Sequence, residues 1–134
     1  MAELNDLGQG DSLPELRVTP DKYLPHRYAG ASGDFNPIHI DPEFAKAVGL
    51  PRNILHGLYS MAQVARAHTD AASDPRSLRR LSVQFRGLGM PEEEIVVTST
   101  VKEAADGRIV TDTVAAQGDN QIVRNAEAEL ELRP

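Results

Sequence analysis

The sequence predicts an α+β protein in which an antiparallel sheet curls around one long, buried helix. Residues 57–72 are mostly small or apolar and have a helical period. From position 78 onward, apolar residues recur at every second position, which is the period of a strand. Such a sheet has one face to bury, and the helix is its only large apolar partner. The length of 134 residues suits one core, so we expect a single domain over residues 1–134.

The predicted helix has one narrow polar stripe, formed by Gln63, Arg66 and Asp70. Its small or apolar positions are Leu58, Met61, Ala62, Val64, Ala65, Ala67 and Ala71. A helix that is apolar over most of its circumference is expected to be largely buried. The alanines would also allow other backbones to approach closely.

Four strands are expected after this helix, at residues 79–86, 93–103, 108–117 and 121–132. Asp106 and Gly107 form a strong hairpin-turn signal, and the sequence GDN marks the next turn. In the last strand the apolar side is expected to carry Ile122, Ala126, Ala128, Leu130 and Leu132, and the polar side Asn125, Glu127, Glu129 and Glu131.

Prolines shape the elements that are expected before the long helix. Residues 10–19 can form a short edge strand, in which Pro14 limits pairing. Thr19 is a possible N-cap and Pro20 the first helical position, but Pro25 would disrupt a continuous helix. We therefore expect a short or broken helix in this segment.

A two-turn helix is expected over residues 41–49. Asp41 can cap its start, Pro42 suits the first turn, and Gly49 can end it. The sequence LPRNIL then forms a connecting loop to the long helix.

The loop before residue 41, SGDFNPIH, holds a carboxylate and an imidazole close together. Gly33 permits an unusual backbone angle just before Asp34, and Pro37 restricts the backbone before His39. The Asn36 side chain can hydrogen-bond local backbone. A pair held in this way could bind one water and serve general acid–base catalysis. The alternative is an Asx-type turn with a histidine packed nearby.

Gly57 opens the long helix, where backbone N–H groups are unpaired and carry the positive end of the dipole. Its N–H could face a carbonyl that develops negative charge. The alternative is a glycine required for close helix packing.

The other histidines are expected to be structural. His56 adjoins the glycine, and His26 and His68 have no partner at an informative spacing. His39 with Asp41 or His56 could bind a metal, but no ligand spacing supports this, so no metal site is expected.

Composition excludes several classes of partner. The net charge of −6 gives no general attraction to nucleic acid or to anionic membranes. A basic cluster of Arg76, Arg79 and Arg80 could still hold one anion, or simply form a solvated strand face. The absence of cysteine rules out disulfides and thiolate chemistry. Neither a signal peptide nor an apolar run of roughly 20 residues is seen, so we expect a cytoplasmic protein.

Residues 28–57, YAGASGDFNPIHIDPEFAKAVGLPRNILHG, closely resemble the hydratase motif of the MaoC-like family. This family includes (R)-specific enoyl-CoA hydratases and 3-hydroxyacyl-thioester dehydratases of the hot-dog fold. The resemblance implies that Asp34 and His39 are catalytic, that the Gly57 N–H holds the thioester carbonyl, and that Asn36 supports the loop. Some members have a serine eight residues after the glycine, where this chain has Ala65.

The resemblance implies reversible hydration of trans-2-enoyl thioesters, carried on CoA or acyl-carrier protein, without a cofactor. Two alternatives remain open: a hot-dog thioesterase, and a non-catalytic acyl-binding subunit of a dehydratase complex. A purely structural domain is disfavoured by the clustered motif. An open sheet edge and the hot-dog resemblance together predict a homodimer or a heterodimer with a paralogue.

Overall fold

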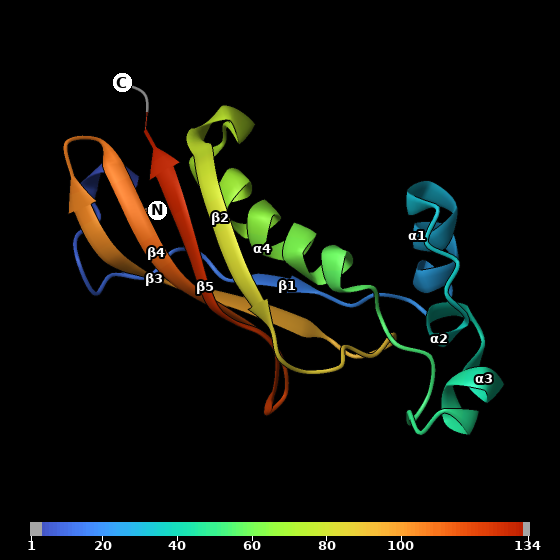
Figure 1. Cartoon of the computed structure of the whole chain (residues 1–134). Coiled ribbons are helices and arrows are strands. Elements are labelled where there is room, and N and C mark those ends of the chain that lie inside the picture. Colours follow the sequence, from blue (N-terminus) through green and yellow to red (C-terminus); the bar gives the residue numbers. More distant parts are fainter. Residues whose placement is uncertain (1–3, 133–134) are drawn as a thin grey trace.

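The computed structural model describes residues 4–132 (Figure 1). Its helices are η1 (Leu4–Asp6), α1 (Leu24–Ser32), α2 (Pro37–Ile40), α3 (Pro42–Ala47), α4 (Gly57–Ala72) and η2 (Pro75–Ser77). Its strands are β1 (Leu16–Val18), β2 (Leu78–Phe85), β3 (Ile95–Ala105), β4 (Arg108–Gln117) and β5 (Asn120–Glu131). Among these residues, no helix is long and apolar enough to cross a membrane.

The five strands form one antiparallel sheet in the order β1-β3-β4-β5-β2, and α4 lies across one side of it (Figure 1). This arrangement confirms the predicted α+β class and the four strands after the helix. Both ends of α4 also agree with the prediction. The predicted edge strand is confirmed as β1, which has three residues and pairs only with β3.

The core lies between α4 and the sheet. Its main cluster consists of Leu55, Tyr59, Val64, Ala67, Ile95, Val97, Ala115, Ile122, Val123 and Ala126. Val64 and Ala67 face this cluster from the middle of α4, and both are almost completely buried. The small side chain of Ala67 keeps the helix close to the sheet, as the alanine-rich sequence predicted.

The prediction of a polar stripe on α4 was partly wrong. Gln63 is buried, with 8% of its surface exposed, whereas Leu58 is 63% exposed. The exposed positions of α4 include Leu58, Ala62, Arg66 and Asp70, which recur every four residues. The exposed face of α4 therefore does not coincide with the predicted polar stripe. The sheet packs against the face that carries Tyr59, Val64 and Ala67, and this packing also buries Gln63.

The helix α1 begins later than predicted. Thr19 and Pro20 precede it, and Pro25 occupies its first turn instead of breaking it. The prediction was wrong because proline is tolerated where the backbone N–H has no partner within the helix. Gly33 ends α1 with a φ of 80°, and its N–H donates to the carbonyl oxygen of Ala29 at 2.8 Å. This left-handed residue turns the chain toward Asp34.

The predicted irregular loop contains a short helix that the sequence analysis missed. Residues Pro37–Ile40 form α2, and the Asn36 side chain caps it by accepting from the Ile38 N–H at 3.1 Å. The same cap chemistry was predicted for the next helix and is confirmed, since Asp41 accepts from the Glu43 N–H at 3.0 Å.

Residues with positive φ shape the sheet at two places, the turn between β3 and β4 and a bulge in β5. Asp106 and Gly107 have φ values of 53° and 76°, which confirms the predicted hairpin turn between β3 and β4. Asn125 has a φ of 49° and lies at a register shift in β5. This bulge breaks the simple alternation of the last strand, so that Ile122 and Val123 are both buried.

The three short helices α1, α2 and α3 lie together beyond the N-terminal end of α4 (Figure 1). Two backbone hydrogen bonds hold the segment that joins them to α4. The Ile54 N–H donates to the carbonyl oxygen of Ile38 at 3.0 Å, and the Leu55 N–H donates to that of Gly89 at 2.8 Å. The segment that leads into α4 is thus attached to α2 and to the loop between β2 and β3.

A buried polar network lies inside the core. His68 is completely buried, and its Nδ1–H donates to the Val64 carbonyl oxygen at 2.7 Å. Its Nε2 must then accept, and the Thr111 hydroxyl lies 2.7 Å away. The Thr113 hydroxyl donates to the Ser99 hydroxyl at 2.9 Å. Burial lowers the pKa of His68 below its ordinary value of 6.5, so that the folded protein favours the neutral ring.

This network predicts an acid-dependent loss of stability. Above the unfolded pKa the neutral ring fits its partners, but as the pH falls below 6.5 only the unfolded chain takes up the proton readily. We expect the wild-type free energy of unfolding to fall by about 1 kcal/mol more than that of His68→Gln between about pH 7.5 and about pH 5.5. Urea titrations at both pH values measure this difference. The exposed His26→Gln serves as the control and should retain the wild-type difference. Equal losses in wild type and His68→Gln would contradict the assignment.

Candidate active site

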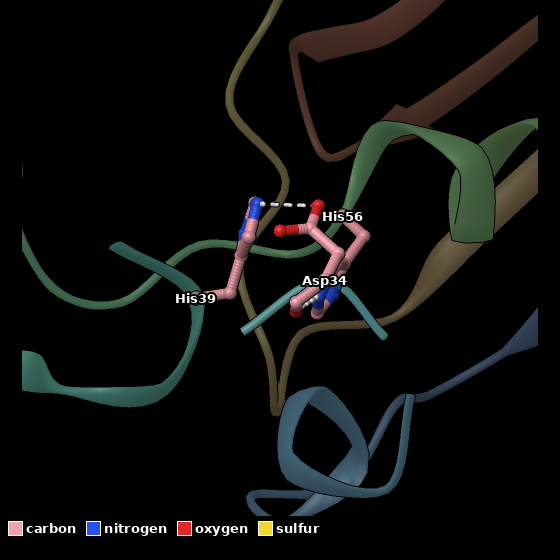
Figure 2. A group of neighbouring side chains, drawn as sticks. All are labelled: Asp34, His39 and His56. Carbon is pink, nitrogen blue, oxygen red and sulfur yellow. Dashed lines mark hydrogen bonds and ion pairs between the residues drawn. The ribbon is translucent and has the colours of Figure 1, made fainter. Parts of the chain in front are cut away.

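Three side chains from separate segments meet at the N-terminal end of α4: Asp34, His39 and His56 (Figure 2). Asp34 follows α1, His39 lies on α2, and His56 is the N-cap residue of α4. One oxygen or nitrogen atom of each lies within 4.8 Å of the other two. The structure thus brings together the two residues predicted to be catalytic and adds a third.

His39 is held in one orientation by backbone contacts. Its Nδ1 lies 2.8 Å from the Ile54 carbonyl oxygen, which can only accept, so the neutral ring carries its proton on Nδ1. The buried Asn53 amide donates to the His39 carbonyl oxygen at 2.9 Å. Nε2 therefore has a free lone pair, and it lies 3.8 Å from Oδ2 of Asp34.

Asp34 combines an Asx-type turn with an open carboxylate. Its Oδ1 accepts from the Asn36 N–H at 3.2 Å, and its own N–H donates to the Ser32 hydroxyl at 3.2 Å. The other oxygen, Oδ2, faces His39 (Figure 2). The Asp34 side chain is 54% exposed and that of His39 11%, so the pair lies at the surface with the imidazole recessed. The Asx-type turn, which was the alternative to catalysis, is compatible with the catalytic arrangement.

Gly57 is the first residue of α4, directly after His56. The N-cap side chain makes no capping hydrogen bond, so the positive end of the helix is not covered by it. A Cβ at Gly57 would lie 3.3 Å from two ring carbons of Phe85, which is itself 49% exposed. Both the open N–H and the packing role that the sequence suggested are therefore compatible with the structure.

The structure gives the remaining histidines different surroundings. His26 is exposed, and its Nε2 lies 3.0 Å from the Ile40 carbonyl oxygen. His68 belongs to the core network. His56 was expected to be structural, but it lies beside Asp34 in space although the two are 22 positions apart in the sequence. Its only sequence signal was its adjacency to Gly57. Ala65, the position at which some relatives have serine, is half-buried on α4.

Asp34, His39 and His56 also include the donor types that bind transition metals. Their geometry does not favour such a site, because the rings of His39 and His56 are stacked with centroids 3.9 Å apart and planes 20° apart. The lone pairs of imidazole nitrogens lie in the ring plane, and the planes of two stacked rings are separate and almost parallel. They cannot converge on one ion at the roughly 2.0–2.1 Å that a zinc–nitrogen bond requires.

The basic cluster that could have held an anion is neutralised within the protein. Arg76 pairs with Asp74 at 3.1 Å and Arg79 with Glu131 at 3.2 Å. Arg80 pairs with Glu127 and Glu129 of the neighbouring strand β5. These contacts favour the alternative interpretation, a solvated strand face.

Residues 7–123 match the family model described as the MaoC like domain. The chain belongs to the MaoC-like family. Because the match extends well beyond the hydratase motif, it also includes the sheet that follows α4. The predicted resemblance is therefore confirmed over most of the chain.

Curated relatives of this MaoC-like protein are mostly longer than the chain. The chain is 39% identical over 120 residues to a Mycobacterium tuberculosis protein named enoyl-CoA hydratase ChsH3. The aligned region covers 84% of the chain and 40% of the relative. Fungal fatty acid synthase beta subunits also match, and the chain spans 6% of the one from Aspergillus oryzae, at 36% identity. The chain thus spans less than half the length of the curated relatives it matches first.

Solved structures support the hot-dog fold. A chain of the ChsH1–ChsH2 complex from M. tuberculosis superimposes with a TM-score of 0.84 at 25% identity, and the match covers 96% of this chain and 99% of that one. This agreement along both chains confirms the predicted fold.

Proposed function

We propose that the protein is a hydro-lyase that adds water reversibly to trans-2-enoyl thioesters and forms (R)-3-hydroxyacyl thioesters. The oxygen of water bonds to C3, one of its hydrogens is delivered to C2, and the double bond between the two carbons is lost. The carrier is CoA or acyl-carrier protein. The observation that carries the proposal is the fixed His39 ring, whose free Nε2 faces the Asp34 carboxylate at 3.8 Å.

A distance of 3.8 Å is too long for a direct hydrogen bond but allows one water to contact both groups. Nε2 of neutral His39 and Oδ2 of Asp34 are both acceptors. A water between them donates one hydrogen to each, which leaves its lone pairs to attack C3. Loss of one of these protons during attack makes the water oxygen a stronger nucleophile. The same face of the substrate can then receive a proton at C2, as syn addition requires.

The Gly57 N–H supplies the second requirement of the reaction. Attack at C3 moves negative charge onto the thioester oxygen, and an N–H at the positive end of a helix stabilises such charge. Gly57 follows His56 directly, so this donor lies beside the catalytic pair. The substrate carbonyl provides the activation itself, and the proposal needs no metal or cofactor.

The named relatives agree with this reaction class. The M. tuberculosis relative is named enoyl-CoA hydratase ChsH3, and an Arabidopsis thaliana protein named peroxisomal enoyl-CoA hydratase 2 is 38% identical over 84 residues. The first test is an assay of the purified chain with crotonyl-CoA and longer enoyl-CoAs. Loss of enoyl absorbance without release of free thiol supports hydration. Release of thiol with the enoyl group intact would instead identify a thioesterase.

The catalytic pair gives the first prediction about activity. Asp34→Asn and His39→Ala should each lower kcat by at least about a hundredfold, because the first replaces the carboxylate with an uncharged, non-basic amide and the second removes the imidazole. Asp34 is exposed, and the buried His39 lies on a short helix outside the main core cluster, so folding should persist in circular dichroism. Asp106→Asn is the matched control, since its turn lies at the far end of the sheet (Figure 1) and asparagine tolerates positive φ. Turnover near the wild-type rate in either site variant would remove that residue from the mechanism.

The role of Gly57 can be isolated with two substitutions. Gly57→Pro removes the N–H, whereas Gly57→Ala retains it, and both place a Cβ against the Phe85 ring. Proline is tolerated in the first turn of a helix. We expect Gly57→Pro to lose about 3 kcal/mol of transition-state stabilisation and Gly57→Ala to lose much less. Steady-state kinetics of the folded variants measure the difference. Equal activity in the two variants would exclude the N–H as the oxyanion donor.

We also propose that the working form is a dimer, either of two copies or with a paralogue. The eight-residue strand β2 forms one edge of the sheet and, among the described residues, pairs with no strand other than β5. Such an edge offers unpaired backbone groups to a second strand. The solved relative in the ChsH1–ChsH2 complex is an assembly of two kinds of chain, which supports a paired arrangement.

Light scattering at micromolar concentration should report about twice the chain mass of 14.6 kDa. Replacing Val83 of β2 with proline should shift the protein toward the monomer, because proline introduces a bulky ring and removes a backbone donor at the edge. A fully active monomer at the same concentration would contradict the dimer.

A further inference from the structure

The N-cap residue of α4 is unusual because its side chain does not cap the helix. Serine, threonine, aspartate and asparagine are preferred at this position because their side chains accept from the first turn. His56 makes no such bond, and the Tyr59 N–H instead donates to the His56 backbone carbonyl at 3.1 Å. His56 is only 3% exposed, so its side chain is buried although it does not cap the helix.

The His56 ring contacts both members of the catalytic pair. Its Nε2 lies 3.0 Å from the backbone carbonyl oxygen of Asp34, to which it donates, and its face lies on the His39 ring with centroids 3.9 Å apart (Figure 2). The ring of Tyr28 lies against His56 as well, at 4.6 Å. His56 therefore fixes the backbone at Asp34 and the plane of the His39 ring at the same time.

The hydrogen bond to Asp34 also determines the state of the His56 ring. A carbonyl oxygen cannot donate, so Nε2 carries the proton and Nδ1 of the neutral ring holds a lone pair. Nδ1 is buried and has no hydrogen-bond partner among the described residues. An unpaired buried acceptor is costly, and a histidine retained for stability alone would be expected to satisfy both nitrogens, as His68 does.

We propose that His56 is a positioning residue for the hydration reaction, which holds the neutral His39 ring and the Asp34 backbone in register for the attacking water. This inference rests on the proposed function. His56 does not touch the reacting atoms itself. Its Nε2–H donates to the Asp34 carbonyl oxygen, and its ring stacks on that of His39. Its contribution should therefore appear in the rate of the chemical step and only through its two neighbours.

Two substitutions separate the two contacts. His56→Gln can retain a donor toward Asp34 but removes the stacking ring, and His56→Phe retains a ring but removes the donor. Each should lower kcat on crotonyl-CoA by about 10- to 100-fold and leave KM within about threefold, because small displacements of a catalytic group are costly. His26→Gln is the matched control. It alters a histidine that contacts a backbone carbonyl outside the stack, and it should retain wild-type kinetics.

A double-mutant cycle with His39→Ala distinguishes positioning from general stability. If the His56 ring acts through its contact with His39, His56→Gln, which removes the stacked ring, should cause no more than a twofold further loss in the His39→Ala background. A full additional loss in that background, or kcat at the wild-type level in both single variants, would overturn the proposal.

Side-chain ¹H–¹⁵N correlation spectra give a readout that does not depend on activity. The wild-type protein should show His39 in the Nδ1–H tautomer and His56 in the Nε2–H tautomer. His56→Gln removes the ring that stacks on His39, so the bond from Nδ1 to the Ile54 carbonyl should loosen and His39 should average between tautomers. His56→Phe and His26→Gln should retain the wild-type His39 tautomer, and an unchanged tautomer in His56→Gln overturns the positioning of the ring. A wild-type protein that is inactive on all enoyl thioesters would overturn the proposed hydration, whereas the spectra would still decide whether His56 orders His39.

Discussion

The hydrogen bond from His39 Nδ1 to the Ile54 carbonyl oxygen connects the two halves of the candidate site. It joins α2, which follows the loop at Asp34, to the segment that leads into α4. The donor is used on one side of the ring, and the free lone pair on the other side faces the carboxylate. Without this bond, neither the direction of Nε2 nor the 3.8 Å distance to Asp34 would be defined.

The long helix serves two requirements that favour different residues. Its middle must pack against the sheet, and this is met by Val64 and Ala67. In the proposed mechanism its first turn must also leave an N–H open to the substrate. Gly57 and an N-cap side chain that makes no capping hydrogen bond meet this requirement. Burial of the middle fixes the helix axis. The direction of the first-turn N–H groups therefore depends on the core.

Two buried histidines, His68 of α4 and its N-cap residue His56, differ in how their ring nitrogens are paired. His68 has both nitrogens paired and links α4 to β4 inside the core, where it favours one packing arrangement. His56 has one nitrogen paired and one without a partner. Buried groups with unsatisfied hydrogen bonds need a reason other than stability. His68 therefore stabilises the core, whereas His56 contacts the two residues of the proposed catalytic pair.

Local sequence determined the regular elements and which two residues form the proposed catalytic pair. The bounds of α4, the turn at Asp106 and the cap at Asp41 follow from short-range periodicity and side-chain chemistry, and the motif around Asp34 is continuous in sequence. Tertiary structure decided the burial of Gln63, which depends on which face of α4 meets the sheet. It also decided the place of His56, because residues 22 positions apart meet only when α1, α2 and α4 pack together.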